Sequence, residues 1–225
     1  MRTHFDEKLA ALRAAVDALA QSALTGVGVL GAALSAGSTE ALAVQAAKVD
    51  EIYRQERESE YAALALLLSE QPVARDLLLV STALKSVTDW SRINVQIADV
   101  AAILQRAERE LDAESRKRLA LMVAAVSRML EAARQALDAD ETALLALCAM
   151  DDEVDALFES TRVALLAETS SSQENRTLAL DVLMVSKYLE RIGDHACSIA
   201  DWVLFARRGV GPQSQRVGHR EKEQR

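Results

Sequence analysis

Proline, cysteine and aromatic residues are scarce in this sequence. Its 225 residues include only two prolines, two cysteines and 4% aromatic side chains. Because proline removes a backbone donor and breaks helices, its scarcity leaves almost the whole length open to helix. Two cysteines in so long a chain argue against a disulfide framework and favour a reducing compartment. Alanine, leucine, glutamate and arginine dominate, as they do in helical bundles, so the composition predicts an all-α protein.

Basic residues are outnumbered by acidic ones. The net charge is −8 and the isoelectric point is near 5.0. Binding to a phosphate backbone needs a basic surface, so this balance argues against nucleic acid as a partner. The exception is the final stretch, residues 207–225, which is basic and polar. We predict a flexible polar tail over residues 210–225.

One segment is apolar enough to suggest a membrane span. Residues 18–39 carry no charge over about twenty positions, the length that crosses a bilayer. They are rich in alanine and glycine, and acidic residues precede them, unlike the basic start of a signal peptide. We expect a buried helix in which Gly26, Gly28 and Gly31 let a neighbouring helix approach closely. The protein is therefore expected in the cytoplasm, meeting a membrane only through its partners.

Six long helices are predicted, bounded by glycine, proline or polar stretches such as the loop TSSSQ. Their ranges are residues 3–36, 38–70, 72–107, 112–137, 140–168 and 174–208. The last has an apolar seam in steps of three and four, made by Val182, Val185, Leu189, Ile192, Ala196, Ile199 and Val203. Since the connections are short, neighbouring helices should be antiparallel.

The two halves of the chain resemble each other. KVDEIY at residues 48–53 corresponds to EVDALF at 153–158, and SRINV at 91–95 corresponds to ERIGD at 190–194. Repetition at this distance indicates a duplicated unit. We therefore predict two tandem, pseudo-symmetric three-helix bundles, the first over residues 1–108 and the second over residues 109–209.

Two acidic pairs in the second half predict a metal site. Residues four apart share a helix face, so Asp151 and Asp155 form one pair and Glu190 and Asp194 form another. An antiparallel hairpin centred on residues 169–173 places both pairs at the same level. Four carboxylates at close range are unfavourable unless a cation is bound. Oxygen ligands suit Mg²⁺, Mn²⁺, Ca²⁺ or iron, with Zn²⁺ a further candidate.

Other interpretations of this region stay open. The acids can instead edge a solvated face and pair with Lys187 and nearby arginines. A di-metal carboxylate enzyme usually needs Glu-x-x-His on facing helices, and neither acidic pair has it. Cys148 and Cys197 lie on the same stripe one turn further along and are expected to be buried core thiols. His195 points roughly 100° away from Asp194.

The first half repeats this construction with different residues. The positions equivalent to the four acids are Ala46, Asp50, Ser91 and Val95, of which only Asp50 is acidic. We therefore expect no metal in the first half.

The motifs of the chain resemble those of the PhoU family. YLERIGDHACSIADWV at residues 188–203 is close to the family's L-E-R-I-G-D-H-A signature, DDEVD at 151–155 to its acidic motif, and QPVARDL at 71–77 to another recurrent sequence. The resemblance covers about residues 3–209 and implies two three-helix bundles with metal clusters. DWSRINVQIADV at 89–100 departs from it, since the family has acids at the positions of Ser91 and Val95.

The resemblance also implies a function. PhoU-like proteins are not enzymes, and the family implies a cytoplasmic negative regulator of phosphate uptake and of the phosphate-starvation response. Such a protein would be an adaptor between a phosphate ABC transporter, through its ATPase component, and a two-component sensor histidine kinase, and would form a homodimer. The alternative is a helical interaction protein that binds no metal and has diverged from phosphate control.

Overall fold

The regular structure of the protein is helical throughout the described part of the chain. The computed structural model describes residues 2–36, 39–107, 111–167 and 173–208. The helices in these ranges are α1 (Arg2–Ala36), α2 (Glu40–Ala46), α3 (Val49–Glu70), α4 (Arg75–Ala107), α5 (Ala113–Arg134), α6 (Glu141–Ala167) and α7 (Gln173–Arg208). The prediction of an all-α bundle is confirmed. The predicted loop at 169–173 and the tail at 210–225 lie outside the described residues, apart from Gln173, which begins α7.

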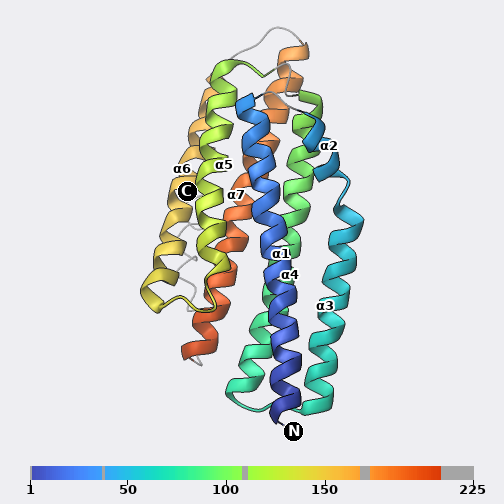
Figure 1. Ribbon diagram of the computed structural model, residues 1–225. Coiled ribbons are helices and arrows are strands. Elements are labelled where there is room, and N and C mark those ends of the chain that lie inside the picture. The colour runs from blue at the N-terminus through green and yellow to red at the C-terminus, as the bar shows by residue number, and fades with distance from the viewer. Residues whose placement is uncertain (1, 37–38, 108–110, 168–172, 209–225) are drawn as a thin grey trace.

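The helices form one elongated bundle (Figure 1). The α3–α4 connection lies at the same end of the molecule as the N-terminus, while α6 ends and α7 begins at the opposite end. Helix α1 packs on α4 and α5, and α4 packs on α7. These contacts join the first half of the sequence to the second, and the apolar core is continuous across both. The division at residue 108 is a division of the sequence and stays a prediction.

The helix boundaries agree closely with the predicted ones, with three exceptions. One is the end of α5 at Arg134, three residues before the predicted end at 137. The predicted helix at 38–70 is interrupted by a turn at Ala47 and Lys48, which separates α2 from α3. Neither proline nor glycine stands there, so no sequence signal marked the break. The predicted start at Pro72 was also too early, because α4 begins at Arg75 after Gln71 and Ala74 adopt left-handed backbone angles with φ of 45° and 49°.

The apolar first helix lies in the core. By length and hydropathy alone, Thr3–Ala36 is long and apolar enough to cross a membrane. In the fold, however, its apolar face is buried, and Leu19, Leu30 and Leu34 are at most 1% exposed. This burial arises because α1 is covered by both α4 and α5. The expected position in the bundle core is confirmed.

The predicted close approach to glycines in α1 holds at one of three positions. A Cβ at Gly26 would lie 2.8 Å from Cγ2 of Ile97 and 2.8 Å from Nε2 of Gln45. At Gly31 the nearest atom would be 3.6 Å away, an ordinary contact, and Gly28 faces open space. Only Gly26 therefore requires the absence of a side chain.

The apolar seam of α7 is confirmed in full. Its seven predicted positions are all at most 2% exposed: Val182, Val185, Leu189, Ile192, Ala196, Ile199 and Val203. Helix α7 also packs on α6 and on α4, on either side of this buried seam. The signature sequence of α7 lies at this point, between the two neighbouring helices.

Candidate functional site

The α6–α7 hairpin brings the predicted acidic residues to one level. Asp151 is half-buried on α6, and its Oδ1 would lie 2.7 Å from a Cβ at position 193 of α7. Any side chain at Gly193 would therefore displace the Asp151 carboxylate. A glycine in a helix interior is less stable than alanine by about 1 kcal/mol. At position 193 the missing side chain leaves room for the Asp151 carboxylate.

Two of the other acids, Asp155 and Asp194, act on the third, Glu190. Burial raises the pKa of Glu190 above its ordinary value of 4.5, Lys187 lowers it, and the charges of Asp194 and Asp155 raise it. Asp155 and Asp194 are exposed, whereas the Glu190 side chain is 14% exposed. Glu190 is thus the acid for which charge compensation matters most, since a charge removed from water must be paired.

Lys187 supplies this compensation. Its Nζ lies 2.8 Å from Oε1 and 2.7 Å from Oε2 of Glu190, and 5.1 Å from the centre of the Phe158 ring on α6. Of the four acids, Glu190 thus pairs with Lys187, as one of the alternative interpretations of the sequence expected.

The residues do not fit a preformed metal centre. Among the described residues no group of three His, Cys, Asp or Glu side chains is arranged to hold a metal ion. The position facing both oxygens of Glu190 is taken by an ammonium group. A metal site made by Asp151, Asp155, Glu190 and Asp194 stays a prediction.

The first half contains an acid that the sequence comparison of the halves missed. Ser91 of α4 donates a hydrogen bond from Oγ to Oε2 of Glu56 on α3 at 2.7 Å, in a buried position. Asp50, the expected acid, is exposed. Glu56 lies in the buried seam of α3 between Ile52 and Ser59, and this position in the seam could have identified it.

A second polar cluster joins α4 to α7. Asp89 accepts a hydrogen bond from Nδ1 of His195 at 2.9 Å and another from Oγ of Ser198 at 2.9 Å. The serine donates to the carboxylate and not to the imidazole, so the arrangement differs from a hydrolytic triad, in which histidine takes the serine proton. His195 faces α4 and not the acidic cluster, as its helical offset from Asp194 predicted.

Further contacts extend this junction along both helices. Thr82 donates to the carbonyl oxygen of Trp202 at 3.3 Å, and the Lys85 ammonium lies 5.3 Å from the centre of the Trp202 ring. Arg106 pairs with Asp181 at 2.5 Å near the opposite end. Because every one of these contacts joins the two halves, the α4–α7 junction fixes their relative position.

Both cysteines are present as thiols in the bundle. Cys197 is fully buried and Cys148 is half-buried against the core, and neither forms a disulfide. The expected burial therefore holds fully for Cys197 and in part for Cys148.

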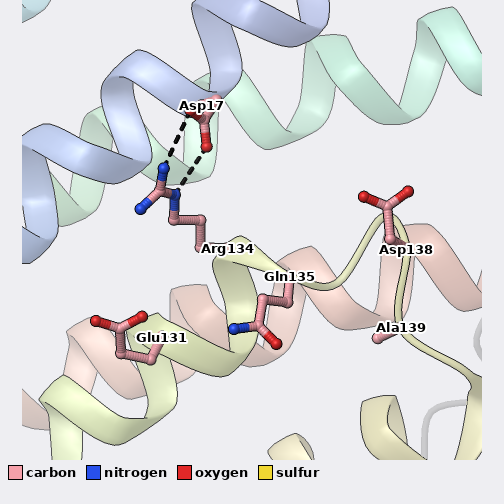
Figure 2. A pocket seen from close by; sticks show the side chains of 6 residues that line it. All are labelled: Asp17, Glu131, Arg134, Gln135, Asp138 and Ala139. Carbon is pink, nitrogen blue, oxygen red and sulfur yellow. Dashed lines mark hydrogen bonds and ion pairs between the residues drawn. The ribbon is translucent and has the colours of Figure 1, made fainter.

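A surface hollow of about 420 Å³ lies where α1 meets the end of α5 (Figure 2). Arg134 reaches across to Asp17, with Nε–Oδ1 and Nη2–Oδ2 distances of 2.8 and 3.2 Å, and Nη1 donates to Gln21. The Arg134 guanidinium holds the pKa of Asp17 below its usual range. Because Asp17 already neutralises the charge of Arg134, the hollow offers little attraction to an anion. The Arg134–Asp17 ion pair joins α5 to α1.

Comparison with known proteins decides the family. A family model described as the PhoU domain matches residues 119–203. A phosphate-specific transport system accessory protein PhoU homolog from Deinococcus radiodurans is 30% identical over 164 residues, which cover 69% of this chain and 73% of the relative. The chain belongs to the PhoU family. A PhoU homolog from Methanothermobacter thermautotrophicus is 29% identical over 151 residues, covering 65% of this chain and 68% of the relative.

Solved PhoU structures have the same fold. PhoU from Pseudomonas aeruginosa superposes with a TM-score of 0.80 at 25% identity, and the match covers 92% of this chain and 100% of that chain. The phosphate transport system regulatory protein PhoU from Streptococcus pneumoniae gives 0.79 at 21% identity, over 92% and 98%. Within this PhoU-family chain the LERIGDHA sequence serves two surfaces: Glu190 and Asp194 face α6, and His195 faces α4.

Proposed function

We propose that this PhoU-family chain regulates phosphate uptake and the phosphate-starvation response as an accessory protein of a phosphate-specific transport system. It would act in the cytoplasm as an adaptor between the ATPase component of a phosphate ABC transporter and a sensor histidine kinase. Its relatives are named as accessory proteins of phosphate-specific transport, which supports the system. Exposed apolar side chains among the described residues offer surfaces for such partners.

Exposed apolar side chains at the two ends of the molecule are the observation that carries the adaptor role. Around the α3–α4 connection they are Tyr61, Leu64, Leu68, Val73 and Leu77, and around the facing ends of α6 and α7 they are Val163, Leu166, Leu180 and Met184. Leu68 is 79% exposed and Val73 76% exposed. Apolar side chains gathered on a surface are typical of protein interfaces. The two groups lie at opposite ends of the bundle (Figure 1), as suits a protein that bridges two partners.

Deletion of the gene tests the regulatory role. We expect a phosphate-starvation reporter to be active in high phosphate in the deletion strain and to be repressed again by the wild-type gene. Leu68→Glu should fail to restore repression, because a charge in an apolar contact must lose its hydration. Leu121→Glu, at a position of α5 that is 49% exposed, is the matched control and should restore it. An unchanged reporter in the deletion strain would contradict the proposal.

Binding with purified partners tests the adaptor role. Leu68→Glu and Leu166→Glu change the two ends separately, since the side chains are 79% and 70% exposed on α3 and α6. We expect each variant to weaken binding to one partner, the ATPase component or the kinase, at least tenfold while the other partner binds normally. Loss of both partners in either variant would speak against separate surfaces. Sedimentation of the free chain would test the proposed homodimer.

A helical interaction protein outside phosphate control is the second candidate. It is favoured by the replacement of acids in the first half, where Ser91 bonds to Glu56, and by the ammonium at Glu190 in the second. Under this alternative, deletion would leave the phosphate reporter unchanged, while the purified chain would still bind a partner through the α3–α4 end.

A further inference from the structure

We propose that Lys187 is a built-in cation that occupies the acidic cluster of α6 and α7 in place of a divalent metal ion. The chain would then hold this cluster together through its own side chain, and removing the ammonium would open the cluster to metal. The family resemblance implies a metal at these positions, and the contacts of Lys187 point the other way.

The position of the ammonium supports this role. Lys187 and Glu190 are both on α7, and Nζ lies within 2.8 Å of both carboxylate oxygens. The same Nζ lies 5.1 Å from the centre of the Phe158 ring on α6. A cation over an aromatic face is attracted to it, so the ammonium contacts both helices of the hairpin. A metal held by Asp151, Asp155, Glu190 and Asp194 would join the same two helices.

Neighbouring basic residues are engaged elsewhere. Arg128 places Nη2 2.8 Å from each oxygen of Glu153, and Arg162 pairs with Glu159 at 2.6 Å. The charge of Arg191 acts on Asp99 of α4. These arginines therefore compensate other carboxylates, and Lys187 is left to compensate Glu190.

A metal ion and the ammonium compete for the Glu190 carboxylate, whose Oε1 accepts a hydrogen bond from Nζ and whose Oε2 lies 2.7 Å from it. A cation that uses both oxygens of Glu190 must lie close to Nζ, and like charges at such a separation repel strongly away from bulk water. The Lys187 side chain is 47% exposed, so its own charge stays hydrated if it moves into solvent, but Glu190, 14% exposed, then needs another cation. Metal affinity should therefore depend on the charge at position 187.

Metal titration of the full-length chain tests the proposal. Wild type, Lys187→Met and Lys187→Arg, each purified without chelator, would be titrated separately with Mn²⁺ and Zn²⁺ by calorimetry. We expect Lys187→Met to bind at least one of the two ions tenfold more tightly than wild type. Lys187→Arg keeps the charge and should bind as weakly as wild type. In a Lys187→Met/Asp194→Asn double variant the gain should disappear.

Two results would overturn the proposal. One is no gain in Lys187→Met with either ion, and the other is a gain of the same size in Lys187→Arg. If the variants fail to fold, ¹⁵N-lysine spectra of the wild-type chain give an independent reading. The Lys187 ammonium should show protons that exchange slowly because they are bonded to Glu190, and rapid exchange would contradict the proposal.

Discussion

The junction between α4 and α7 should depend on Asp89. Its carboxylate accepts hydrogen bonds from His195 and Ser198 at 2.9 Å each, and its side chain is 13% exposed. Replacement by alanine removes both bonds and leaves two donors in a partly buried place. A hydrogen bond to a charged group contributes about 1.5–3 kcal/mol in favourable surroundings. Because the His195 side chain is 25% exposed, water recovers part of the loss. We expect Asp89→Ala to lower the free energy of unfolding by about 2–4 kcal/mol.

Urea unfolding followed by circular dichroism measures this change. Asp99→Ala is the matched control, since Asp99 is on the same helix and faces the same junction. Burial raises the pKa of the Asp99 carboxyl and Arg191 opposes this effect, so the charge gains little from its position. We expect Asp99→Ala to unfold near wild type or slightly later. Equal midpoints for wild type and Asp89→Ala would refute the reasoning that these two bonds fix the junction.

Three further perturbations have definite directions. Gln45 is 1% exposed, and neither polar atom of its side chain has a hydrogen-bond partner in the described part of the chain. Gln45→Met should therefore raise the free energy of unfolding, measured in urea, by about 1–2 kcal/mol. The control Gln135→Met, at an exposed position, should leave it unchanged. Asp112→Ala removes the N-cap of α5, in which Oδ1 accepts two backbone bonds at 2.8 Å, and should cost about 1 kcal/mol, with Asp112→Asn largely restoring it. These bonds, chiefly from Ser115, lower the pKa of Asp112 below 3.8, so the cost of Asp112→Ala should shrink as the pH falls below that value, and a cost unchanged at pH 2 would contradict the cap. Burial raises the pKa of Glu190 above 4.5, so its contribution to stability is present at low pH and is lost as the pH rises through the raised value. Wild type should therefore lose stability relative to Glu190→Gln as the pH rises above 4.5, and parallel pH profiles would contradict this.

Most helix boundaries could be predicted because they depend on neighbouring residues. Asp112 caps α5 one residue before its start, and the seam of α7 follows from the spacing of its apolar residues. The break at Ala47 could not be predicted, because no residue there disfavours helix. Glu56 was missed for a related reason. The comparison of halves assumed equal register in both hairpins, and the contact of Glu56 with Ser91 shows that the first hairpin has its own.

The sequence by itself determined most helix boundaries, the apolar seam of α7 and the level at which the four acids meet. These follow from helical periodicity and from the centre of one hairpin, both of which are local. Only the tertiary structure decided what the acids face. The ammonium of Lys187 is positioned between Glu190 and Phe158, and Asp89 meets His195 across 106 residues of chain. Such contacts depend on the register and rotation of helices packed against each other, and no spacing within one helix encodes them.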